Sequence, residues 1–342
     1  MKAIILAAGE GTRIRPLSLF RPKPLLPVAG EPLITRIVKT LIESKQIEEI
    51  AVVIGYLGDK LKKELQKNIR SQSLVFIEQK EQKGTGDAVA VCSRFLSGER
   101  DFLIVYGDVT LTREALDNLM NFYRRGAYRG VLLAVERGER GRYGVVEMRG
   151  DKLVRIHEKR EDVIGPVNSG VYILTSDILP VVENLHPSPR GERELTDAIN
   201  IISSKGVEVG VLLDKGDWWF DIGRVDEYLR ANSYFMKLEL GKNIELCSNN
   251  IIIGNGATLE GPCKIGQGTL IEEEATIIGP SYLGEETIIG KNTKIISSII
   301  LEKSHVMENS ILKNTIVGEE AMIKPNTIID NGIVVTPKST YP

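Results

Sequence analysis

The sequence has few of the residues that disulfides and zinc sites require. Only three of its 342 residues are cysteines. Cys92, Cys247 and Cys263 are widely spaced and form no CxxC motif, which argues against both a disulfide framework and a zinc site. We therefore expect all three cysteines to be buried as small apolar side chains.

Long hydrophobic runs and an excess of charge of one sign are also missing. Residues 1–6 carry one lysine and an apolar run that is too short for a secretory signal or a transmembrane span. A formal net charge of −2, with 26% charged residues, gives no electrostatic reason to expect a nucleic acid or a membrane as partner. We expect a soluble, cytoplasmic protein whose length is typical of two or three domains.

Up to about residue 240, short apolar runs alternate with helical patterns. The expected elements, in chain order, are a strand at 2–6, a helix at 33–44, a strand at 50–55, a helix at 60–69, a strand at 74–77, a helix at 87–96, a strand at 101–108 and a helix at 113–124. This alternation predicts an α/β domain with a mainly parallel sheet covered on both faces, and ligands at the carboxyl ends of its strands. Denser strands after residue 130 predict an antiparallel section that could hold a second substrate.

From residue 247 onward, apolar residues recur at every sixth position. The series is Cys247, Ile253, Leu259, Ile265, Ile271, Ile277, Leu283, Ile289, Ile295, Leu301 and Met307, and after one slip Val317, Ile323, Ile329 and Val335. Such a repeat, with small and polar residues between, is typical of a parallel β-helix. The repeats predict about five coils of three rungs each. We therefore expect two domains, 1–240 and 241–342, with a helix that ends at Gly241 near their boundary.

One segment, LAAGEGTRIRPLSLFRPKPLLPVAG at residues 6–30, follows the first strand directly. Gly9 and Gly11 remove side-chain bulk, so backbone N–H groups can approach a phosphate, and Arg13 and Lys23 can supply positive charge. Two common phosphate motifs are absent, because Ile14 occupies the third glycine position of GxGxxG and no GxxxxGK[ST] is present. The residues alone leave two interpretations open, a phosphate-binding loop and a rigid connection.

Prolines are frequent in this segment, which we call the signature segment. Pro16, Pro22, Pro24 and Pro27 argue against a helix that begins immediately after the first strand. They predict an extended, stiffened loop.

The signature segment resembles the pattern LxxGxGTRLxPLTxxxPKxLxPV of the sugar-1-phosphate nucleotidyltransferases, with mild departures at Ile14 and Ser18. Other matching stretches are GTGDA at 84–88, YGD at 106–108, YGVV at 143–146, EK at 158–159, NSGVYIL at 168–174, ELTDAI at 194–199 and WWFDIG at 218–223. Many members also carry a carboxy-terminal left-handed β-helix of hexapeptide repeats. The resemblance thus covers the whole chain and implies a Rossmann-like nucleotidyltransferase domain followed by such a β-helix.

The reaction that the resemblance implies is attack by a sugar 1-phosphate on the α-phosphorus of a nucleoside triphosphate, which gives a nucleotide sugar and pyrophosphate. The nucleophile is already an anion, because its second pKa lies near about 6. No general base is needed, and the work falls to cations, backbone amides and Mg²⁺. The scarcity of histidine fits this chemistry, since His157, His186 and His305 each lie far from any other candidate ligand in the sequence.

The resemblance also implies roles for individual residues. Arg13, Lys23 and Asp108 are the implied catalytic residues. Asp108 and Asp221 are the implied Mg²⁺ ligands, and two carboxylates suit this hard ion. The implied nucleotide-binding residues are Leu6, Ala8, Gly9, Gly11, Thr12, Arg13, Gln79, Gly84, Thr85 and Asp108. The implied sugar-phosphate-binding residues are Lys23, Gly144, Glu158, Lys159 and Asn168.

The stretch QKEQKGTGDAV at 79–89 resembles the base-recognition loop of the family. GTG at this position is typical of uridylyltransferases that act on N-acetylglucosamine 1-phosphate, GLA of many thymidylyltransferases, and GTA of guanylyl and adenylyl enzymes. We expect UTP or dTTP, with N-acetylglucosamine 1-phosphate or glucose 1-phosphate; a mannose-1-phosphate guanylyltransferase is the alternative. Asp87 is also a good helix N-cap, and both interpretations can hold.

The role of the expected β-helix stays open. Some relatives use theirs as an acetyltransferase, but His305 is the only histidine in this half, and the glycine-alanine-glycine segment of that activity is missing. We therefore favour a structural role and a homo-oligomer that forms through the β-helix. A non-catalytic regulatory member of the same fold is a further alternative, against which Arg13, Lys23, Asp108 and Asp221 are all present.

Overall fold

The computed structural model describes residues 1–69, 73–126, 128–137, 141–330 and 332–342. They form two compact units, the first made of Met1–Glu10 and Leu33–Trp219, and the second of Gly11–Pro32 and Phe220–Pro342. Most of the signature segment therefore belongs to the same unit as the carboxy-terminal strands. The expected domains, 1–240 and 241–342, stay a prediction.

A nine-stranded sheet forms the centre of the first unit, in the order β5-β4-β1-β6-β10-β7-β11-β9-β8. The strands are β1 (Lys2–Leu6), β4 (Glu49–Ile54), β5 (Leu74–Glu78), β6 (Asp101–Tyr106), β7 (Gly130–Val135), β8 (Gly144–Arg149), β9 (Lys152–Glu158), β10 (Val167–Thr175) and β11 (Val209–Asp214). Strands β5, β4, β1 and β6 are parallel, whereas β10 is antiparallel to both β6 and β7. The mainly parallel sheet and its antiparallel section are confirmed.

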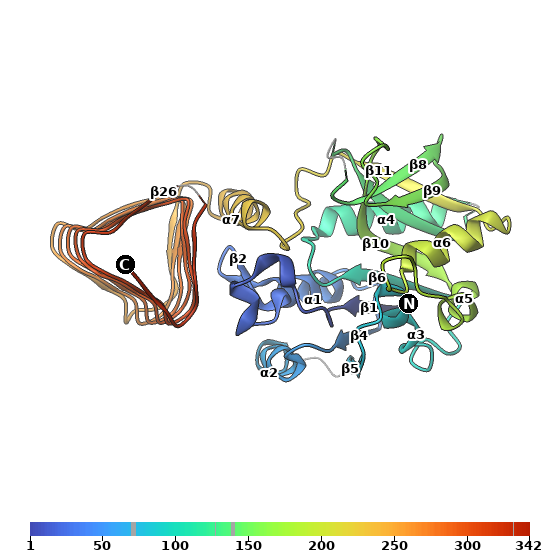
Figure 1. Cartoon of the computed structure of the whole chain (residues 1–342), viewed down its shortest axis with the longest axis horizontal. Coiled ribbons are helices and arrows are strands. Elements are labelled where there is room, and N and C mark those ends of the chain that lie inside the picture. Colours follow the sequence, from blue (N-terminus) through green and yellow to red (C-terminus); the bar gives the residue numbers. More distant parts are fainter. Residues whose placement is uncertain (70–72, 127, 138–140, 331) are drawn as a thin grey trace. The chain divides into compact units, whose positions relative to one another are not determined.

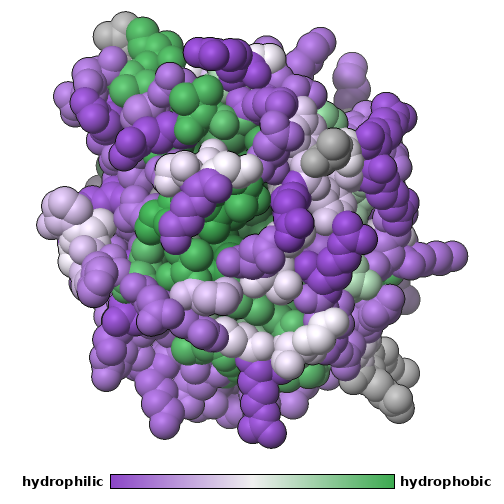
Figure 2. Space-filling view, turned by 90° about the vertical axis from the view of Figure 1, so that its right-hand side faces the viewer, coloured by the Kyte–Doolittle hydropathy of each residue, from purple (hydrophilic) through white to green (hydrophobic). Residues whose placement is uncertain are grey.

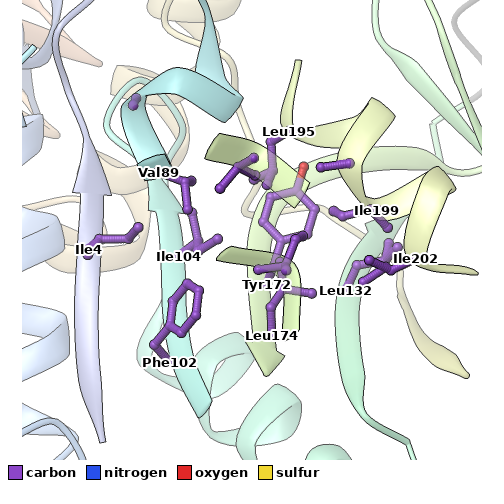
Figure 3. Close-up of a cluster of buried hydrophobic side chains, with 14 of the residues drawn as sticks. Ile4, Val89, Phe102, Ile104, Leu132, Tyr172, Leu174, Leu195, Ile199 and Ile202 are labelled. Atoms are coloured by element: carbon purple, nitrogen blue, oxygen red, sulfur yellow. The ribbon is translucent and has the colours of Figure 1, made fainter. Parts of the chain in front are cut away.

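The helices of this unit include all four that the sequence predicts. They are α1 (Leu33–Glu43), α2 (Gly58–Asn68), α3 (Thr85–Ala90), α4 (Arg113–Arg125), α5 (Leu179–Glu183) and α6 (Leu195–Ser204), with a 3₁₀ helix at Ser176–Ile178. Helix α3 is shorter than the predicted 87–96, and it begins at Thr85 after Gly84, so Asp87 lies in its first turn and is not the N-cap. In the core, Tyr172 of β10 packs among Ile104, Leu132 and Leu195 (Figure 3).

In the second unit, the signature segment is folded into three short 3₁₀ helices, at Thr12–Ile14, Leu17–Leu19 and Lys23–Leu25, followed by strands β2 (Pro27–Val28) and β3 (Glu31–Pro32). The expectation of an extended loop is therefore wrong. Proline at the start of a 3₁₀ or α-helical turn loses no backbone hydrogen bond, which is why Pro24 fits near the start of the third one.

The rest of the second unit is helix α7 (Val225–Leu240) and a left-handed parallel β-helix. Its three sheets have six, six and five strands among the described residues, and its coils form the triangle in Figure 1. The strands are β12 (Ile244–Leu246), β13 (Ile252–Ile253), β14 (Thr258–Glu260), β15 (Cys263–Ile265), β16 (Leu270–Ile271), β17 (Thr276–Ile278), β18 (Ser281–Leu283), β19 (Ile288–Ile289), β20 (Lys294–Ile296), β21 (Ile299–Ile300), β22 (His305–Val306), β23 (Ile311–Lys313), β24 (Ile316–Val317), β25 (Met322–Ile323), β26 (Ile328–Asp330), β27 (Val334–Val335) and β28 (Thr340–Tyr341). These strands make five complete coils and two further rungs, close to the prediction of about five coils.

The inward side chains correct one part of the predicted repeat. Ile300 and Val306 are fully buried in the core of the β-helix, in the places predicted for Leu301 and Met307. Two rungs are therefore only five residues long, one before Ile300 and one before Val317, because strand β21 pairs with β18 and β24 at a spacing of 17 residues. The repeat has two slips, where the sequence suggested one.

The cysteines fit the prediction only in part. Cys92 and Cys263 are buried, but Cys247 is exposed at the first coil, where no preceding coil covers it. Burial raises the pKa of the Cys92 thiol to about 12. Within the described ranges, we find no helix that is both long enough and apolar enough to cross a bilayer.

Candidate functional site

A buried ion pair joins the signature segment to the stretch WWFDIG. Lys23 and Asp221 are 4% and 5% exposed, and Lys23 Nζ lies 2.9 Å from Asp221 Oδ1. Arg13, whose side chain is half exposed, places Nη2 3.2 Å from Asp221 Oδ2. The backbone N–H of Gly223 donates to Asp221 Oδ1 at 2.8 Å. Two predicted phosphate-binding cations thus face one carboxylate, which both of them share.

Glycines on two sides give Lys23 its space. Gly11 has φ +65°, and a Cβ there would lie 2.9 Å from Lys23 Cβ. A Cβ on Gly223 would lie 2.6 Å from Lys23 Nζ. Both positions therefore need glycine, Gly11 for its backbone conformation as well as for the contact. Thr12, the remaining predicted nucleotide-binding residue of this unit, is exposed at the start of the first 3₁₀ helix.

Charge governs the titration of Asp221. Burial raises the pKa of its carboxyl, but the nearby Lys23 and Arg13 charges and the hydrogen bonds from Lys23 and Gly223 outweigh this and hold the pKa below its ordinary value. Asp221 is therefore ionised at neutral pH, and the Lys23–Asp221–Arg13 group, which we call the cation triad, carries one net positive charge.

In the first unit, the carboxyl ends of β1 and β6 bring several predicted residues together. The strand ends Leu6 and Tyr106 are register partners, and the N–H of Gly107 donates to Leu6 O at 2.8 Å. A Cβ on Gly107 would lie 2.9 Å from Ala7 Cβ, so only glycine permits this approach before Asp108. Gly9 is exposed, and nothing lies within 4 Å of where its Cβ would stand.

Neighbouring strands complete this edge of the sheet. The N–H of Tyr56 donates to Ala8 O at 3.1 Å, and the N–H of Gln79 donates to Ile54 O at 2.9 Å. Leu6, Ala8, Gly9, Gln79 and Asp108 thus lie at the carboxyl ends of β1, β5 and β6, with the end of β4 between those of β1 and β5, where the sequence predicts a nucleotide site.

The predicted base-recognition loop is shaped by contacts within the chain. Gln79 is buried, and its Nε2 donates to Gly84 O at 3.1 Å and to Asp87 Oδ2 at 2.9 Å. Gly84 has φ +111°, and a Cβ there would lie 2.6 Å from Arg193 O. Thr85 Oγ1 accepts a hydrogen bond from the N–H of Leu195 at 2.9 Å. The glycine at 84 is therefore explained by packing, whether or not a base lies against it.

The predicted sugar-binding residues lie on the antiparallel section. Gly144 of β8 is the register partner of Glu158 of β9, and a Cβ on Gly144 would lie 2.9 Å from Glu158 Oε1. Asn168 of β10 donates from Nδ2 to Tyr172 Oη at 2.5 Å. Lys159, by contrast, is exposed just past the end of β9, with φ +49°.

Three residues near these were not predicted. Tyr106 forms side-chain hydrogen bonds with Tyr172 and Thr85, which connects the base loop to the antiparallel section. Arg190 lies 2.9 Å from Glu194 and 3.9 Å from Glu158. Glu194 and Tyr106 are in the matched stretches ELTDAI and YGD, so the sequence did contain a signal for them.

Glu194 has an unusual titration. Burial raises the pKa of its carboxyl to about 7, the charge of Arg190 lowers it, and the charges of Glu158 and Glu192 raise it further. Because this carboxyl titrates near neutral pH, the charge of the cluster of Glu158, Arg190 and Glu194 depends on pH.

A search for clustered metal-ligand side chains and for surface grooves adds little to the description of the site. Within the described ranges, no three or more His, Cys, Asp or Glu side chains gather as a metal site. A groove of about 700 Å³ is lined by α5, α6 and the loop at 184–188, and none of the predicted site residues lines it. The face shown in Figure 2 is mostly hydrophilic, with hydrophobic residues gathered in its centre.

Comparisons with protein families match both parts of the chain. A family model described as Nucleotidyl transferase matches residues 2–237. A second model, described as GMPPB C-terminal domain, matches residues 247–340.

Among individual proteins, the chain is 35% identical over 270 residues to the bifunctional protein GlmU of Methanococcus maripaludis strain S2, which covers 76% of this chain and 62% of the relative. The chain thus spans about three fifths of the length of this relative. It is 31% identical over 334 residues to the bifunctional protein GlmU of Methanococcus aeolicus, which covers 93% of this chain and 78% of the relative.

Among solved structures, the crystal structure of a UDP-glucose pyrophosphorylase complexed with UDP-glucose is similar, with a TM-score of 0.61 and 24% identity. The match covers 70% of this chain and 99% of the other. Identity this low supports the fold alone.

Proposed function

Because the chain belongs to the nucleotidyl transferase family, we propose that it joins a nucleoside triphosphate to a sugar 1-phosphate, giving a nucleotide sugar and pyrophosphate. The match of a nucleotidyl transferase model to 2–237 and of a second model to 247–340 supports the proposed domains 1–240 and 241–342.

The observation that carries the proposal is the cation triad. A buried ammonium group beside a second cation is costly unless an anion compensates it. Here Asp221 is that anion, at 2.9 Å from Lys23 and 3.2 Å from Arg13. A triphosphate is a stronger counter-charge, so Lys23 and Arg13 can exchange the carboxylate for phosphate oxygens as the substrate binds.

This exchange of ion-pair partners fits the nucleotidyl transfer that we propose. The sugar phosphate is already a nucleophile at neutral pH, so the barrier comes mainly from alignment and from repulsion between two polyanions. Lys23, buried in the space that Gly11 and Gly223 leave, offers a positive charge in a confined place, while the half-exposed Arg13 can follow the phosphates. We assign catalysis to Arg13 and Lys23, with Asp108 as the third predicted catalytic residue.

Mg²⁺ is the proposed cofactor, with Asp108 and Asp221 as its predicted ligands. Carboxylate oxygens are the donors that this ion prefers, and both Asp221 oxygens become available once Lys23 and Arg13 turn to phosphate. When bound, the ion supplies neutralisation of phosphate charge. The ionised state of Asp221, which its lowered pKa secures, suits this role.

We assign the nucleotide to the edge formed by the carboxyl ends of β5, β4, β1 and β6 with the loop at 79–89, and the sugar to the group around Gly144, Glu158 and Asn168. UTP or dTTP, with N-acetylglucosamine 1-phosphate or glucose 1-phosphate, stay the predicted substrates, and GTP with mannose 1-phosphate the alternative. We likewise propose that the protein is soluble and cytoplasmic, and that it forms a homo-oligomer through the β-helix. Light scattering on the purified chain tests the oligomeric state.

The test is a matrix of substrates. The chain is incubated with Mg²⁺, each of UTP, dTTP, GTP and ATP, and each of glucose, N-acetylglucosamine and mannose 1-phosphate, and released pyrophosphate is measured. We expect release with one nucleotide and one sugar phosphate far above the rest, and its loss in Lys23→Met and Asp108→Asn. No release from any pair by the folded protein would refute the proposed function.

A further inference from the structure

Arg21, which the sequence analysis did not single out, forms an ion-pair network with the β-helix. Its Nε donates to Glu319 Oε2 at 2.9 Å, and its Nη2 lies 2.6 Å from the same oxygen and contacts Glu302. The side chains of Arg21 and Glu319 are only 14% and 11% exposed. These residues are 298 positions apart in the sequence, and all lie within the second unit.

The two glutamates hold equivalent places on successive coils. Glu285, Glu302 and Glu319 follow one another at a spacing of 17 residues. Backbone hydrogen bonds join these positions, since the N–H of Lys303 donates to Glu285 O and the N–H of Glu320 donates to Glu302 O. Adjacent strands lie about 4.8 Å apart, so this glutamate ladder places like charges close together. The planar guanidinium of Arg21 can donate to two of them at once and so lower their mutual repulsion, which a lysine cannot do as well.

Other contacts hold the rest of the signature segment to the same unit. Tyr228 of α7 donates to Pro27 O at 2.9 Å, and the N–H of Ala29 donates to Asn232 Oδ1 at 2.9 Å. Gly30 packs on Lys264 and Tyr282, and a Cβ there would lie 2.7 Å from Lys264 Cδ. Around Lys23 itself, the N–H of Leu25 donates to Pro22 O and the N–H of Leu26 donates to Lys23 O, so both of these backbone hydrogen bonds stay within the turn. Side chains anchor this short turn to the rest of the unit, Lys23 through Asp221 and Arg21 through the β-helix.

From these contacts we propose that Arg21 is a positioning residue, through which Glu302 and Glu319 of the β-helix hold Lys23 in its catalytic place. The β-helix then acts on the reaction directly, since it fixes the segment that carries a phosphate-binding cation. The kinetic consequence rests on the proposed function, whereas the ordering of the turn at Lys23–Leu26 does not.

The first test needs no substrate. Amide hydrogen exchange at Leu25 and Leu26 is compared in the wild type, Arg21→Ala and Glu319→Gln, all as the full chain. We expect exchange at these two amides to rise by about tenfold in both variants, because the turn opens more often. Lys291→Ala removes an exposed ion pair on the β-helix, to Glu273 at 2.7 Å, and is expected to leave these amides unchanged. Unchanged exchange at Leu25 and Leu26 in Arg21→Ala would overturn the proposal.

The second test separates positioning from mere stability. In Arg21→Ala we expect kcat to fall by about tenfold or more and KM for the sugar phosphate to rise, because Lys23 is both a proposed catalytic residue and a predicted ligand of this substrate. The exchanged pair, Arg21→Glu with Glu319→Arg, should recover part of the lost kcat and part of the protection at Leu25 and Leu26. A fall in thermal stability with kcat unchanged would refute positioning. If even the wild type releases no pyrophosphate, the proposed function fails, and the exchange experiment alone decides whether Arg21 orders the turn.

Discussion

Lys23 Nζ and Asp221 Oδ1 lie 2.9 Å apart, in a place where both side chains are almost fully buried. Removing either charge leaves the other with less compensation in a medium that solvates it poorly. The pair therefore links folding to the proposed chemistry: the segment that would bind phosphate is held, before any substrate binds, by the carboxylate that the substrate would displace.

Lys23→Met should destabilise the protein strongly, by about 3 kcal/mol, because Asp221 then keeps the half-exposed Arg13 as its counter-charge and loses the buried one. Asp221→Asn should also destabilise it, and the double variant should lose less than the sum of the two. Urea unfolding of all four proteins gives the coupling energy. Strictly additive losses would contradict a coupled buried pair.

Gly9→Ala and Gly11→Ala should change different properties of the protein, nucleotide binding in the first case and stability in the second. Gly11 has φ +65° and touches Lys23, so its replacement should lower stability by about 1–2 kcal/mol and reduce turnover. Gly9 has open space around it, so its replacement should leave stability unchanged. If the nucleotide does approach this backbone, Gly9→Ala should raise KM for the nucleotide. Thermal unfolding and initial rates distinguish the two, and an unchanged KM would remove Gly9 from the nucleotide site.

Glu194 should give the folded protein a measurable pH dependence. Burial raises its pKa from 4.5 in the reference state to about 7 in the folded state. Between these values the unfolded chain loses the proton first, so the contribution of Glu194 to stability falls as pH rises from 4.5 to 7 and is level above that. Glu194→Gln should thus match the wild type near pH 4.5 and exceed it by about 2 kcal/mol at pH 8. Urea unfolding across this range is the measurement, and parallel curves for the two proteins would contradict the raised pKa.

Where one physical pattern dominates, the sequence was a good guide to the fold. Strand β1 was predicted to the residue, since a short apolar run between polar segments fits little else. Strand β11 was missed, although it pairs in parallel with β7 in the middle of the sheet. In the signature segment, the prolines suggested extended backbone, but fixed φ angles near −65° also suit 3₁₀ turns, and the local hydrogen bonds favour these.

At the site, the sequence named both partners of the Lys23–Asp221 pair but not the pair. Lys23 was assigned to phosphate and Asp221 to metal, so nothing suggested that they would meet each other across 198 residues. Arg21 was missed for the same reason, since its glutamates lie in the repeats, where a charged corner residue is indistinguishable from a solvated one. Long-range charge pairs of this kind become visible only when the fold brings the segments together.

The inward register of the β-helix after the first five-residue rung can also be tested. Val306 and Met307 are adjacent apolar residues, and only one of them can point into the core. Val306 is fully buried and pairs in register with Ile289 and Ile323, whereas its neighbour Met307, which the uninterrupted repeat selected, is only partly buried. Val306→Asn places an amide among Ile289, Ile323 and the coils around them, where it finds no water, so it should destabilise the β-helix by roughly 2–4 kcal/mol. Met307→Asn should cost roughly 1 kcal/mol or less. Because coils unfold in part, amide exchange at β19, β22 and β25 is a better measure than one melting temperature. A larger effect of Met307→Asn than of Val306→Asn would mean that the rung before Ile300 has six residues after all, and that the inward register runs through Met307.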